Sequence, residues 1–569
     1  MGRWAMAEYP GGEVRICPLD AAGRPAGPAE SHAGPGAAVR ARPEAERWVW
    51  RSSAALRPRL LDAGRWVARC YDVEAAEAIL LGYEGAHGAP RSLPAALARL
   101  RRLPVPEDPP PRAVEPEQQG SLFDPEPGVP LPPGTDPLRA LLEVYAGQVA
   151  RTAAVRHPER MRLLLAAESA GTLVAAEMSR AGLPWRADLH RRLLDELLGE
   201  RYAGGREDLE PRRLAELAEE VSRAFGAPVR PDLPAEVTAA FRRAGFAPAS
   251  TRSWELRQID HPAVAPLLEY KKLYRIHTAH GRSWLRTWVR EGRFRPVYLP
   301  GGAASGRWTT HGGGALQIPR VIRRAVVADP GRRLVVADAD QLEPRVLAAV
   351  SRDPALMTVA ADPGDLYAAA ADRGFAGDRA QAKLAVLGAV YGQTSGDGLR
   401  RLAALRRRFP AAVAYVDEAA RAGERGRLVR THLGRTCPPW ADGAGAEGAG
   451  ADGAGREGAA ARARGRFTRN FVVQGSAAEW ALLMLAALRA ALHRRGLAAE
   501  LVFFQHDEVI VHCPERETEE VAAAVRAAGE EAGRIAFGET PVRFPFTVHT
   551  VRCYADAGPG LSESADDAP

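Results

Sequence analysis

Cysteine is scarce and scattered in this chain. Its five cysteines, spread over 569 residues, form no Cys-x-x-Cys pair, which argues against a disulfide framework and a cysteine-based zinc site. No run of about eighteen apolar residues is present, so the sequence predicts no membrane-spanning helix. Residues 1–10 lack the apolar segment of a secretion signal. These absences together predict a protein of the reducing cytoplasm.

What the chain does have is ample apolar material and a mild excess of positive charge. Hydrophobic residues make up 46% of the sequence, and a length of 569 residues suggests several domains. The net charge of +7 permits a polyanionic partner without requiring one. Alanine, arginine, glycine and proline are abundant, as in proteins from GC-rich genomes, so a single arginine is weak evidence for an anion site.

Two low-complexity stretches divide the chain. Residues 104–133 are rich in proline and acidic residues and are predicted to form a flexible linker. Residues 441–463 are mostly glycine, alanine and alternating charges, and are predicted to be a disordered insertion. Residues 1–102, before the linker, predict a compact segment with helices over 56–81 and 92–103.

Between these two stretches the apolar spacing is helical. It predicts helices over residues 136–180, 186–198 and 207–225. A basic group follows, in which Lys271 and Lys272 lie among aromatic residues, a composition that suits contacts with phosphates and bases. An ordinary solvated helix face would explain the same pattern.

Asp338 lies at the end of a predicted buried strand. The apolar run 334–337 predicts the strand, and residues 344–350 predict a helix just after it. A carboxylate at the mouth of a buried strand is well placed to hold a metal ion. On its own, however, an aspartate in this position is more often a helix cap.

A second acidic group lies in a predicted β-hairpin over residues 501–512. Two apolar runs flank His506, Asp507 and Glu508, which are predicted at the turn. These residues could simply be turn formers. Together with Asp338 they could instead supply carboxylates to two divalent ions, the arrangement that supports nucleotidyl transfer.

The predicted helix over residues 379–392 carries two cations one turn apart. Arg379, Lys383, Leu387 and Tyr391 recur at every fourth residue and share one slowly winding face. Neighbouring cations repel each other, and a bound polyphosphate would remove that repulsion. Two solvated basic residues on an amphipathic helix are the alternative.

Taken in order, these groups resemble the motifs of the family A DNA polymerases, the bacterial DNA polymerase I type. The resemblance covers residues 137–556 and implies a mixed α+β fold: a right hand of palm, fingers and thumb with an antiparallel palm sheet, preceded by a small α/β exonuclease-like domain. The matching residues are Gly306 and Arg307; Asp338, Gln341, Glu343 and Arg345; Arg379, Lys383, Tyr391 and Gly392; Arg466, Asn470, Gln474 and Gly475; and His506, Asp507 and Glu508.

The resemblance also implies domain boundaries. Residues 1–102 correspond to the exonuclease-like domain, 103–136 to the linker and 137–569 to the polymerase domain. Within the polymerase domain, the implied thumb covers residues 186–290 and the implied fingers cover 351–465, with the palm as the remainder.

The resemblance further implies a role for each matching residue. Asp338 and Asp507 would hold two Mg²⁺ ions, for which Mn²⁺ could substitute, with Glu508 close to them. Lys383 is the implied catalytic cation, and Glu343 is the implied gate that excludes a ribose 2′-OH. The implied nucleotide-binding residues are Arg379, Lys383, Glu343, Leu387, Tyr391 and His506. The implied DNA contacts are Arg307, Arg345, Arg466, Asn470, Gln474, Lys271 and Lys272.

The chain departs from the family pattern at four places, one of which is the insertion at residues 441–463, where the family has a short loop. Leu387 replaces an aromatic residue near the sugar, and Ala339-Asp340 replace Tyr-Ser after the first metal aspartate. The N-terminal segment has no Asp-x-Glu pair on a strand, and Asp72 only echoes another exonuclease motif, so we expect an inactive exonuclease domain.

A short apolar motif in the linker suggests a further partner. Gln119, Leu122 and Phe123 resemble the peptide by which bacterial polymerases dock onto the sliding clamp. An incidental apolar pair in a linker explains the motif equally well.

The sequence therefore predicts a monomeric, nucleoid-associated DNA polymerase that acts on primer–template DNA and dNTPs, in repair or gap filling. A single-subunit RNA polymerase would share the basic helix, but Glu343 argues against it, since a ribonucleotide enzyme needs open space there. A non-catalytic DNA-binding scaffold, descended from a polymerase, is the other alternative; Leu387 favours it, while Asp338, Asp507 and Lys383 argue against it.

Overall fold

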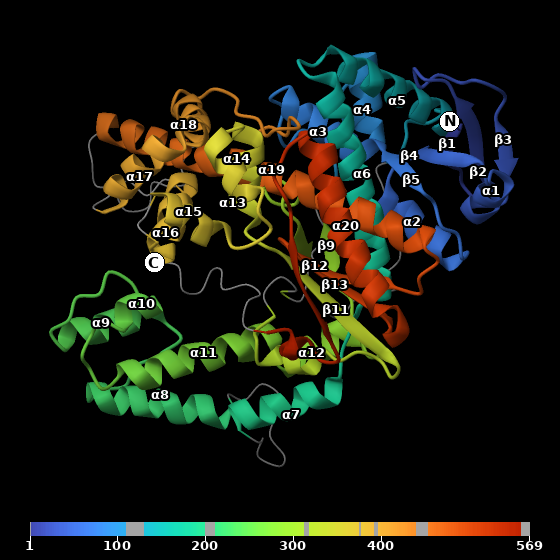
Figure 1. Cartoon of the computed structure of the whole chain (residues 1–569). Helices are drawn as coiled ribbons and strands as arrows, with labels where there is room; N and C mark the ends of the chain where they lie inside the picture. Colours follow the sequence, from blue (N-terminus) through green and yellow to red (C-terminus); the bar gives the residue numbers. More distant parts are fainter. Residues whose placement is uncertain are drawn as a thin grey trace. The chain divides into compact units, whose positions relative to one another are not determined.

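The computed structural model describes residues 2–109, 130–199, 211–311, 314, 318–374, 377–391, 397–439 and 453–558. They form two compact units, and Figure 1 labels their helices and most of their strands. The first unit contains Met1–Arg180, Tyr298–Thr309 and Ala337–Val548, and the second contains Ala181–Val297, Thr310–Val336 and His549–Pro569. Lys271 and Lys272 are the only predicted site residues that belong to the second unit.

The first unit begins with a five-stranded sheet in the order β3-β2-β1-β4-β5. Strand β1 pairs antiparallel with β2 and parallel with β4, and β4 pairs parallel with β5. The prediction of helices throughout residues 56–81 is wrong, because β5 interrupts this segment by pairing with β4. The elements are β1 Gly2–Glu8, β2 Val14–Leu19, β3 Glu30–His32, α1 Pro35–Ala41, β4 Ala45–Trp50, α2 Ser53–Asp62, β5 Arg69–Asp72, α3 Val73–Tyr83 and α4 Leu93–Arg101.

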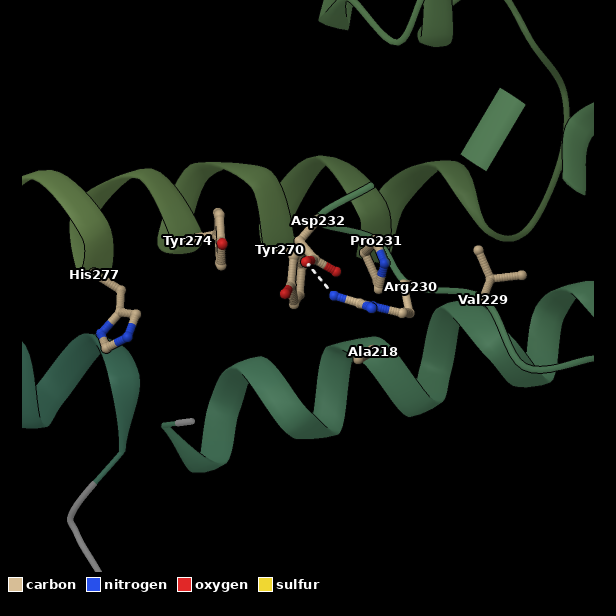
Figure 2. A pocket seen from close by; sticks show the side chains of 8 residues that line it. All are labelled: Ala218, Val229, Arg230, Pro231, Asp232, Tyr270, Tyr274 and His277. Atoms are coloured by element: carbon tan, nitrogen blue, oxygen red, sulfur yellow. Dashed lines mark hydrogen bonds and ion pairs between the residues drawn. The ribbon is translucent and has the colours of Figure 1, made fainter. Parts of the chain in front are cut away.

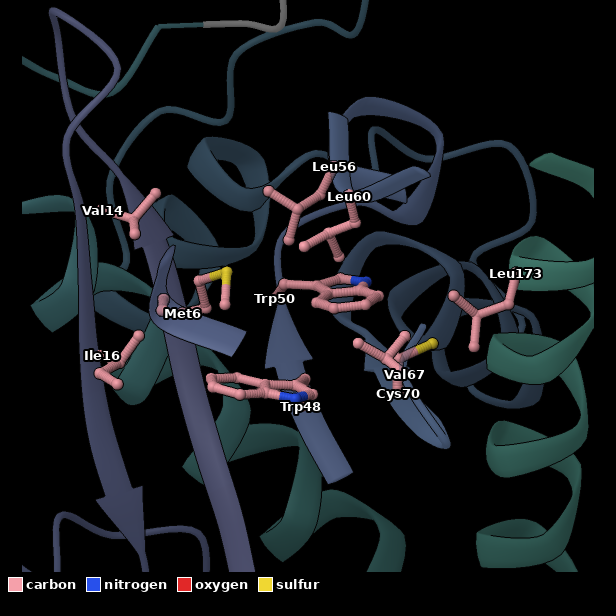
Figure 3. Packing of buried hydrophobic residues seen from close by; sticks show 11 residues of the cluster. Met6, Val14, Ile16, Trp48, Trp50, Leu56, Leu60, Val67, Cys70 and Leu173 are labelled. Carbon is pink, nitrogen blue, oxygen red and sulfur yellow. The ribbon is translucent and has the colours of Figure 1, made fainter. Parts of the chain in front are cut away.

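One face of this sheet packs into a hydrophobic core, shown in Figure 3. Met6 of β1, Trp48 and Trp50 of β4 and Cys70 of β5 are all at most 4% exposed, and Leu173 of α6 (Pro158–Ala181) packs with them. Because successive side chains of a strand point to opposite faces, the residues between these belong to the other face of the sheet.

A buried charge cluster joins this sheet to later helices. Glu177 of α6 accepts hydrogen bonds at 2.8 Å from the Nε atoms of Arg57 in α2 and Arg489 in α19 (Gly453–Arg494). Arg489 also donates to the backbone carbonyls of Val67 and Ala68. The N-terminal sheet is therefore tied to the longest helix of the same unit.

The second unit is mainly helical. Phe241, Leu256 and Leu267 are fully buried in its core. A hollow between α8 and α11, shown in Figure 2, is lined by Arg230 and Tyr274 among others, and Arg230 is paired with Asp232 at 3.1 Å. Its first elements are β6 Leu183–Pro184, α7 Ala187–Leu198, α8 Arg212–Phe225, α9 Pro234–Arg243, α10 Ser253–Leu256, α11 Val264–His280, α12 Arg282–Trp288, β7 Val289–Arg290 and β8 Arg293–Phe294.

A four-stranded sheet in the order β12-β13-β11-β14 carries the predicted acidic residues. Strands β12 and β13 pair antiparallel, with Gln505 opposite Glu508, so the predicted hairpin is confirmed and its turn is His506-Asp507. The remaining elements are α5 Pro137–Ala154, β9 Val297–Leu299, β10 Thr309–His311, β11 Arg332–Ala339, α13 Leu342–Ser351, α14 Pro354–Ala360, α15 Leu366–Gly374, α16 Arg379–Tyr391, α17 Asp397–Arg408, α18 Pro410–Glu424, β12 Glu500–Gln505, β13 Glu508–Pro514, α20 Thr518–Phe537 and β14 Phe546–Val551. The mixed α+β fold class is confirmed.

Helix α19 is 42 residues long and is mostly interior. Its segment Gly458–Arg494 has a mean hydropathy of 1.6 over 18 residues, enough in length and composition to cross a membrane, but 83% of that stretch is buried inside the fold. Packing therefore accounts for its apolar character. The prediction of disorder for residues 441–463 is wrong in its second part, because residues from Gly453 onward are helical, as their high alanine content favours.

Asp353 holds the first turns of two helices, and its removal is expected to destabilise the fold. Its fully buried carboxylate accepts from Ala355 N and Leu356 N in α14, and from Ala411 N and Ala412 N in α18. Since one helix cap contributes about 0.5–2 kcal/mol, the loss of both caps in Asp353→Ala should lower the free energy of unfolding by about 1–4 kcal/mol.

Denaturant titration measures this change. Asp362→Ala is the matched control, because the Asp362 side chain is exposed and accepts one hydrogen bond, from Gly364 N. Equal losses of stability in the two variants would contradict the double-cap role.

Candidate active site

The turn of the β12–β13 hairpin lies directly against the end of β11. Ala339 N donates a 3.1 Å hydrogen bond to the backbone carbonyl of Asp507. Asp338 is the neighbour of Ala339, so two carboxylates that are 169 positions apart in the sequence, at 338 and 507, are brought to one place. Residues 338 and 507 are therefore neighbours in the fold, and the metal-binding role expected of their carboxylates stays a prediction.

Burial and neighbouring carboxylates raise the pKa values of both aspartates. Burial raises the pKa of Asp338, and the charges of Asp507, Glu508 and Asp340 raise it further. Burial likewise raises the pKa of Asp507; Arg307 opposes that shift, whereas Glu343 and Glu508 reinforce it. The half-buried pair therefore favours a bound cation, which would offset the repulsion between the charges.

The donor set fits a hard divalent ion that is shared with a substrate. In the described part of the chain, no three His, Cys, Asp or Glu side chains form a complete metal cage. Mg²⁺ commonly takes only one or two protein carboxylates and fills its other positions with water and substrate phosphates. Asp338 and Asp507 meet that requirement, and Glu508, which is 3% exposed, begins the adjoining strand.

Asp340 has hydrogen-bond partners of its own on β14 and in the segment before it. Its Oδ1 accepts a 2.7 Å hydrogen bond from the hydroxyl of Thr547, and its backbone N–H donates to the carbonyl of Pro545. Among the charges that raise the pKa of Asp338, Asp340 has the smallest effect. The extra carboxylate noted in the sequence is thus engaged mainly with the edge strand β14.

Arg307 lies among the acidic residues of the site. It forms an ion pair with Glu343, whose side chain is 15% exposed, and its charge lowers the pKa of Asp507. The pKa of His506 falls to about 4, first through partial desolvation and second through the nearby Arg307. His506 is therefore neutral at physiological pH, and Glu343 is held in one place.

A buried charge cluster under Arg307 was not found from the sequence. Gly306 has a φ of 84°, and a Cβ added there would lie 2.3 Å from Nε of Arg435. Arg435 is 7% exposed and donates to Glu168 at 2.7 Å, while burial raises the pKa of Glu479, which also faces Arg435, to about 7. The only sequence signal was a Gly-Arg step, Gly434-Arg435, which abundant glycine and arginine made unremarkable.

Helix α16 forms as predicted, and the structure pairs one of its two cations. Arg379 Nε donates to Asp365 Oδ2 at 2.5 Å. Asp365 also caps α15 through Tyr367 N and accepts from Gln341 Nε2 at 3.2 Å, so one carboxylate joins the start of α13 to α15 and α16.

The other residues of that helix face differ in exposure. Lys383 is exposed and has no ion pair among the described residues. It is one of three lysines in a chain that otherwise uses arginine for positive charge. Leu387 is half-buried, and the side chain of Tyr391 lies outside the described residues, as does Gly392.

Two of the predicted DNA contacts are used inside the protein. Arg345 is fully buried, and its guanidinium donates to the backbone carbonyls of Asp340, Ala360, Asp362, Gly364 and Arg543. The prediction that Arg345 contacts DNA is therefore wrong; it holds the entry of α13 against the segment that precedes α15. In the second unit, Lys271 Nζ donates to Thr251 Oγ1 at 3.0 Å.

The remaining predicted DNA contacts stay accessible. Arg466 is exposed on α19, with Asn470 and Gln474 half-buried one and two turns further along the same helix. Lys272 is exposed on α11. These four positions remain candidates for contacts with nucleic acid.

Comparison with known proteins identifies the class to which this fold and site belong. The family model for DNA polymerase family A matches residues 239–550, more than half of the chain. The chain is a member of DNA polymerase family A. The predicted family assignment is thereby confirmed.

Individual relatives agree with the family match. The chain is 31% identical over 301 residues to DNA polymerase I of Chloroflexus aurantiacus, a match that covers 48% of this chain and 30% of the relative. It is 27% identical over 298 residues to DNA polymerase I of Aquifex aeolicus, covering 50% of each. The matched stretch thus spans between about a third and a half of these relatives' length.

A solved structure shares the fold over nearly the whole chain. The POL domain of Pol1 from M. smegmatis, solved in complex with DNA primer-template and dNTP, superposes with a TM-score of 0.68 at 19% identity. The likeness covers 97% of this chain and 95% of that one, so it includes the N-terminal sheet.

Removing one of the facing carboxylates is expected to stabilise the metal-free protein as the pH rises. A carboxyl whose pKa is raised on folding contributes stability that is fully present below its ordinary pKa of about 4 and is lost as the pH rises through the raised value. Asp338→Asn does not ionise, so in EDTA its melting temperature should exceed that of the unchanged protein increasingly from about pH 5 to pH 9.

Thermal unfolding with and without Mg²⁺ completes the measurement. Mg²⁺ should raise the melting temperature of the unchanged protein and leave that of Asp338→Asn nearly constant, because ligand binding stabilises the state that binds. Asp372→Asn, a change at an exposed aspartate, is the matched control and should follow the unchanged protein. If the melting temperature changed with pH in the same way in all three proteins, the ionisation of Asp338 would not affect folding stability, and the prediction would be refuted.

Proposed function

We propose that this protein is a template-directed DNA polymerase that adds dNTPs to a primer 3′-OH and releases pyrophosphate. The observation that carries the proposal is the contact of the Asp507 turn with the end of β11, which makes residues 338 and 507 neighbours. Family membership supports the same conclusion. Two bound Mg²⁺ ions, held by these aspartates, would stabilise the attacking and leaving oxygens of an in-line displacement.

The cations of α16 support the binding of a triphosphate. Lys383 is exposed, and Arg379 is exposed beside Asp365, so both can reach a ligand from one helix face. Lys383 would neutralise charge on the leaving phosphates, and Arg379 would exchange some of its pairing with Asp365 for the triphosphate. Leu387, on the same face, offers an apolar contact without the flat surface of a ring.

Residues around the hairpin support recognition of the sugar and of the primer end. The ion pair with Arg307 holds the Glu343 carboxylate in place, which supports a role for Glu343 in excluding a ribose 2′-OH. His506 is neutral at physiological pH and can therefore donate or accept a hydrogen bond without adding charge. We assign Arg307, Gln474 and His506 to the primer end, and Arg466, Asn470 and Lys272 to the DNA backbone.

The domain assignment belongs to the proposal as well. Residues 186–290 act as the thumb, 351–465 as the fingers and the remaining polymerase residues as the palm. Repair or gap filling close to the nucleoid, as a monomer, fits an enzyme of this type. A sliding clamp is a further proposed partner, through Gln119, Leu122 and Phe123, which lie outside the described residues.

Primer extension tests the proposal. Asp338→Ala and Asp507→Ala should each lower the extension rate by at least about 10³-fold, because each removes several kcal/mol of transition-state stabilisation. Affinity for primer–template DNA, measured by fluorescence anisotropy, should change little. Asp372→Ala is the exposed control and should extend normally.

The same assay separates the alternatives. A ribonucleotide polymerase would incorporate rNTPs as readily as dNTPs, and a scaffold would bind DNA without extending it in Mg²⁺ or Mn²⁺. Full extension by both aspartate variants would refute the metal assignment.

We also propose that the N-terminal domain has no exonuclease activity. Asp72 is 3% exposed, and its carboxylate accepts from Ser53 N at 2.7 Å and from Ala75 N at 3.0 Å, so it acts as a structural cap. Among the described residues, no acidic group suited to metal binding lies in this domain.

Incubation of the protein with 5′-labelled single-stranded DNA and Mg²⁺ should leave the 3′ end intact over hours. Asp72→Asn should lower thermal stability without changing that result. Metal-dependent removal of 3′ nucleotides, lost in Asp72→Asn, would overturn this proposal.

A further inference from the structure

Three arginines form a row across the N-terminal sheet. In the strand register, Arg3 of β1 lies opposite Arg47 of β4, and Arg47 lies opposite Arg69 of β5. Like charges that are directly opposite each other on neighbouring strands repel and destabilise a sheet. Three in one row are therefore a cost to the fold unless an anion lies against them.

The row faces away from the hydrophobic core. The next row of the register, Trp4, Trp48 and Cys70, packs with that core, and Figure 3 shows Trp48 and Cys70 inside it. Because side chains alternate along strands, the arginines point to the opposite face. Tyr145 of α5 lies on that face, where Arg3 and Arg47 both influence its pKa.

No carboxylate neutralises the row within the described residues. Arg3 donates to the carbonyl of Ala21 at 3.2 Å and to the hydroxyl of Tyr145, and neither acceptor carries a charge at neutral pH. Arg47 and Arg69 form no ion pair in the described part of the chain. Burial lowers the pKa of Arg47, and the neighbouring Arg3 and Arg69 lower it further. Keeping Arg47 charged in this position therefore costs free energy.

The arginines line a small hollow. It has a volume of ≈ 50 Å³ and is lined by Gly2, Arg3, Glu46, Arg47 and Arg69. A β-bulge between Gly2 and Arg3 makes Glu46 the extra residue of β4, and a bulge re-aims the side chains beside it. The hollow is too small for a nucleobase and suits one phosphate group, although the exposed Glu46 carboxylate would weaken that binding.

We propose that Arg3, Arg47 and Arg69 form a binding site for a phosphate group on the N-terminal domain. The ligand is either a phosphate of a nucleic-acid backbone or a free phosphate or pyrophosphate ion; their shared chemistry is a compact oxyanion that accepts hydrogen bonds from planar guanidinium groups. The proposal does not depend on polymerase activity, because none of these residues belongs to the active site.

Abundant arginine does not account for the row. Compositional drift places arginines on solvated surfaces, where repulsion is screened and inexpensive. Arg47 is instead half-buried between two further cations, in register on adjacent strands, and lacks an acidic partner among the described residues. A bound anion would supply the missing negative charge and lower the free-energy cost of an arginine at position 47.

Thermal unfolding with inorganic phosphate tests the site, using full-length protein at constant ionic strength. Arg47→Gln should be at least as stable as the unchanged protein in phosphate-free buffer, because it relieves repulsion. Its apparent affinity for phosphate, from the rise in melting temperature, should fall at least about tenfold. Arg40→Gln, at an exposed arginine of α1, is the matched control for the loss of one charge and for the general stabilising effect of phosphate.

The substitution Glu46→Gln should change the affinity for phosphate in the opposite direction to Arg47→Gln. Removing the carboxylate from the hollow should strengthen phosphate binding severalfold, which a purely structural role of the row would not produce. Equal phosphate responses in the unchanged protein, Arg47→Gln and Arg40→Gln would overturn the proposal.

Hydrogen exchange distinguishes the two sources of phosphate. The Asp338→Asn protein is incubated with a single-stranded oligonucleotide, with pyrophosphate or with inorganic phosphate, so that loss of polymerase activity leaves the test unaffected. Protection of β1 and β4 amides by the oligonucleotide at concentrations where the free ions give none supports a nucleic-acid backbone. Protection by the ions alone supports a free anion, and no protection by any of the three overturns the site.

Discussion

One backbone hydrogen bond, from Ala339 to the carbonyl of Asp507, fixes the relation on which the proposed chemistry depends. It joins the end of β11 to the tightest point of the β12–β13 hairpin, where His506 has a φ of 55°. A left-handed residue in such a turn costs free energy, and the buried strands on both sides of the turn offset that cost. The two aspartates are therefore placed by the sheet rather than by mutual attraction, which their charges oppose.

Arginine side chains supply positive charge next to these acidic residues. Arg307 stands beside Glu343 and Asp507, and the turn that carries it rests on Arg435. Arg435 is buried with Glu168, and removal of two such charges from water costs several kcal/mol each before their attraction is counted. The buried pair is better explained by the geometry it enforces on Gly306, where there is no room for a side chain.

The parts of the fold that could be predicted from sequence are those in which local pattern and tertiary structure agree. The apolar run before Asp338, the hairpin around Asp507 and the four-residue spacing of α16 each have one strong local interpretation, and all three are confirmed. Strand β5 was missed because a four-residue strand shows no periodicity, and only its pairing with β4 decides its conformation.

Side-chain roles were harder to predict than elements. Arg345 was assigned to DNA because its motif matches, yet its five carbonyl partners come from segments up to 198 positions away. Nothing in the local sequence indicates that those carbonyls converge. The same applies to Asp365 and Arg379, whose pairing depends on how α15 meets α16. Resemblance to a family identified the residues, whereas the structure showed which of them already have partners.

The Asp365–Arg379 pair has a consequence for how any polyanion would be received by helix α16. A ligand that binds Arg379 must first displace Asp365 from the guanidinium. The net binding free energy is therefore the difference between the new ionic contact and the one that is lost. The released Asp365 would still cap α15 and accept from Gln341, so the exchange would leave both of those contacts in place. Through Asp365, the cation Arg379 is thus linked to Gln341, which lies three residues after Asp338.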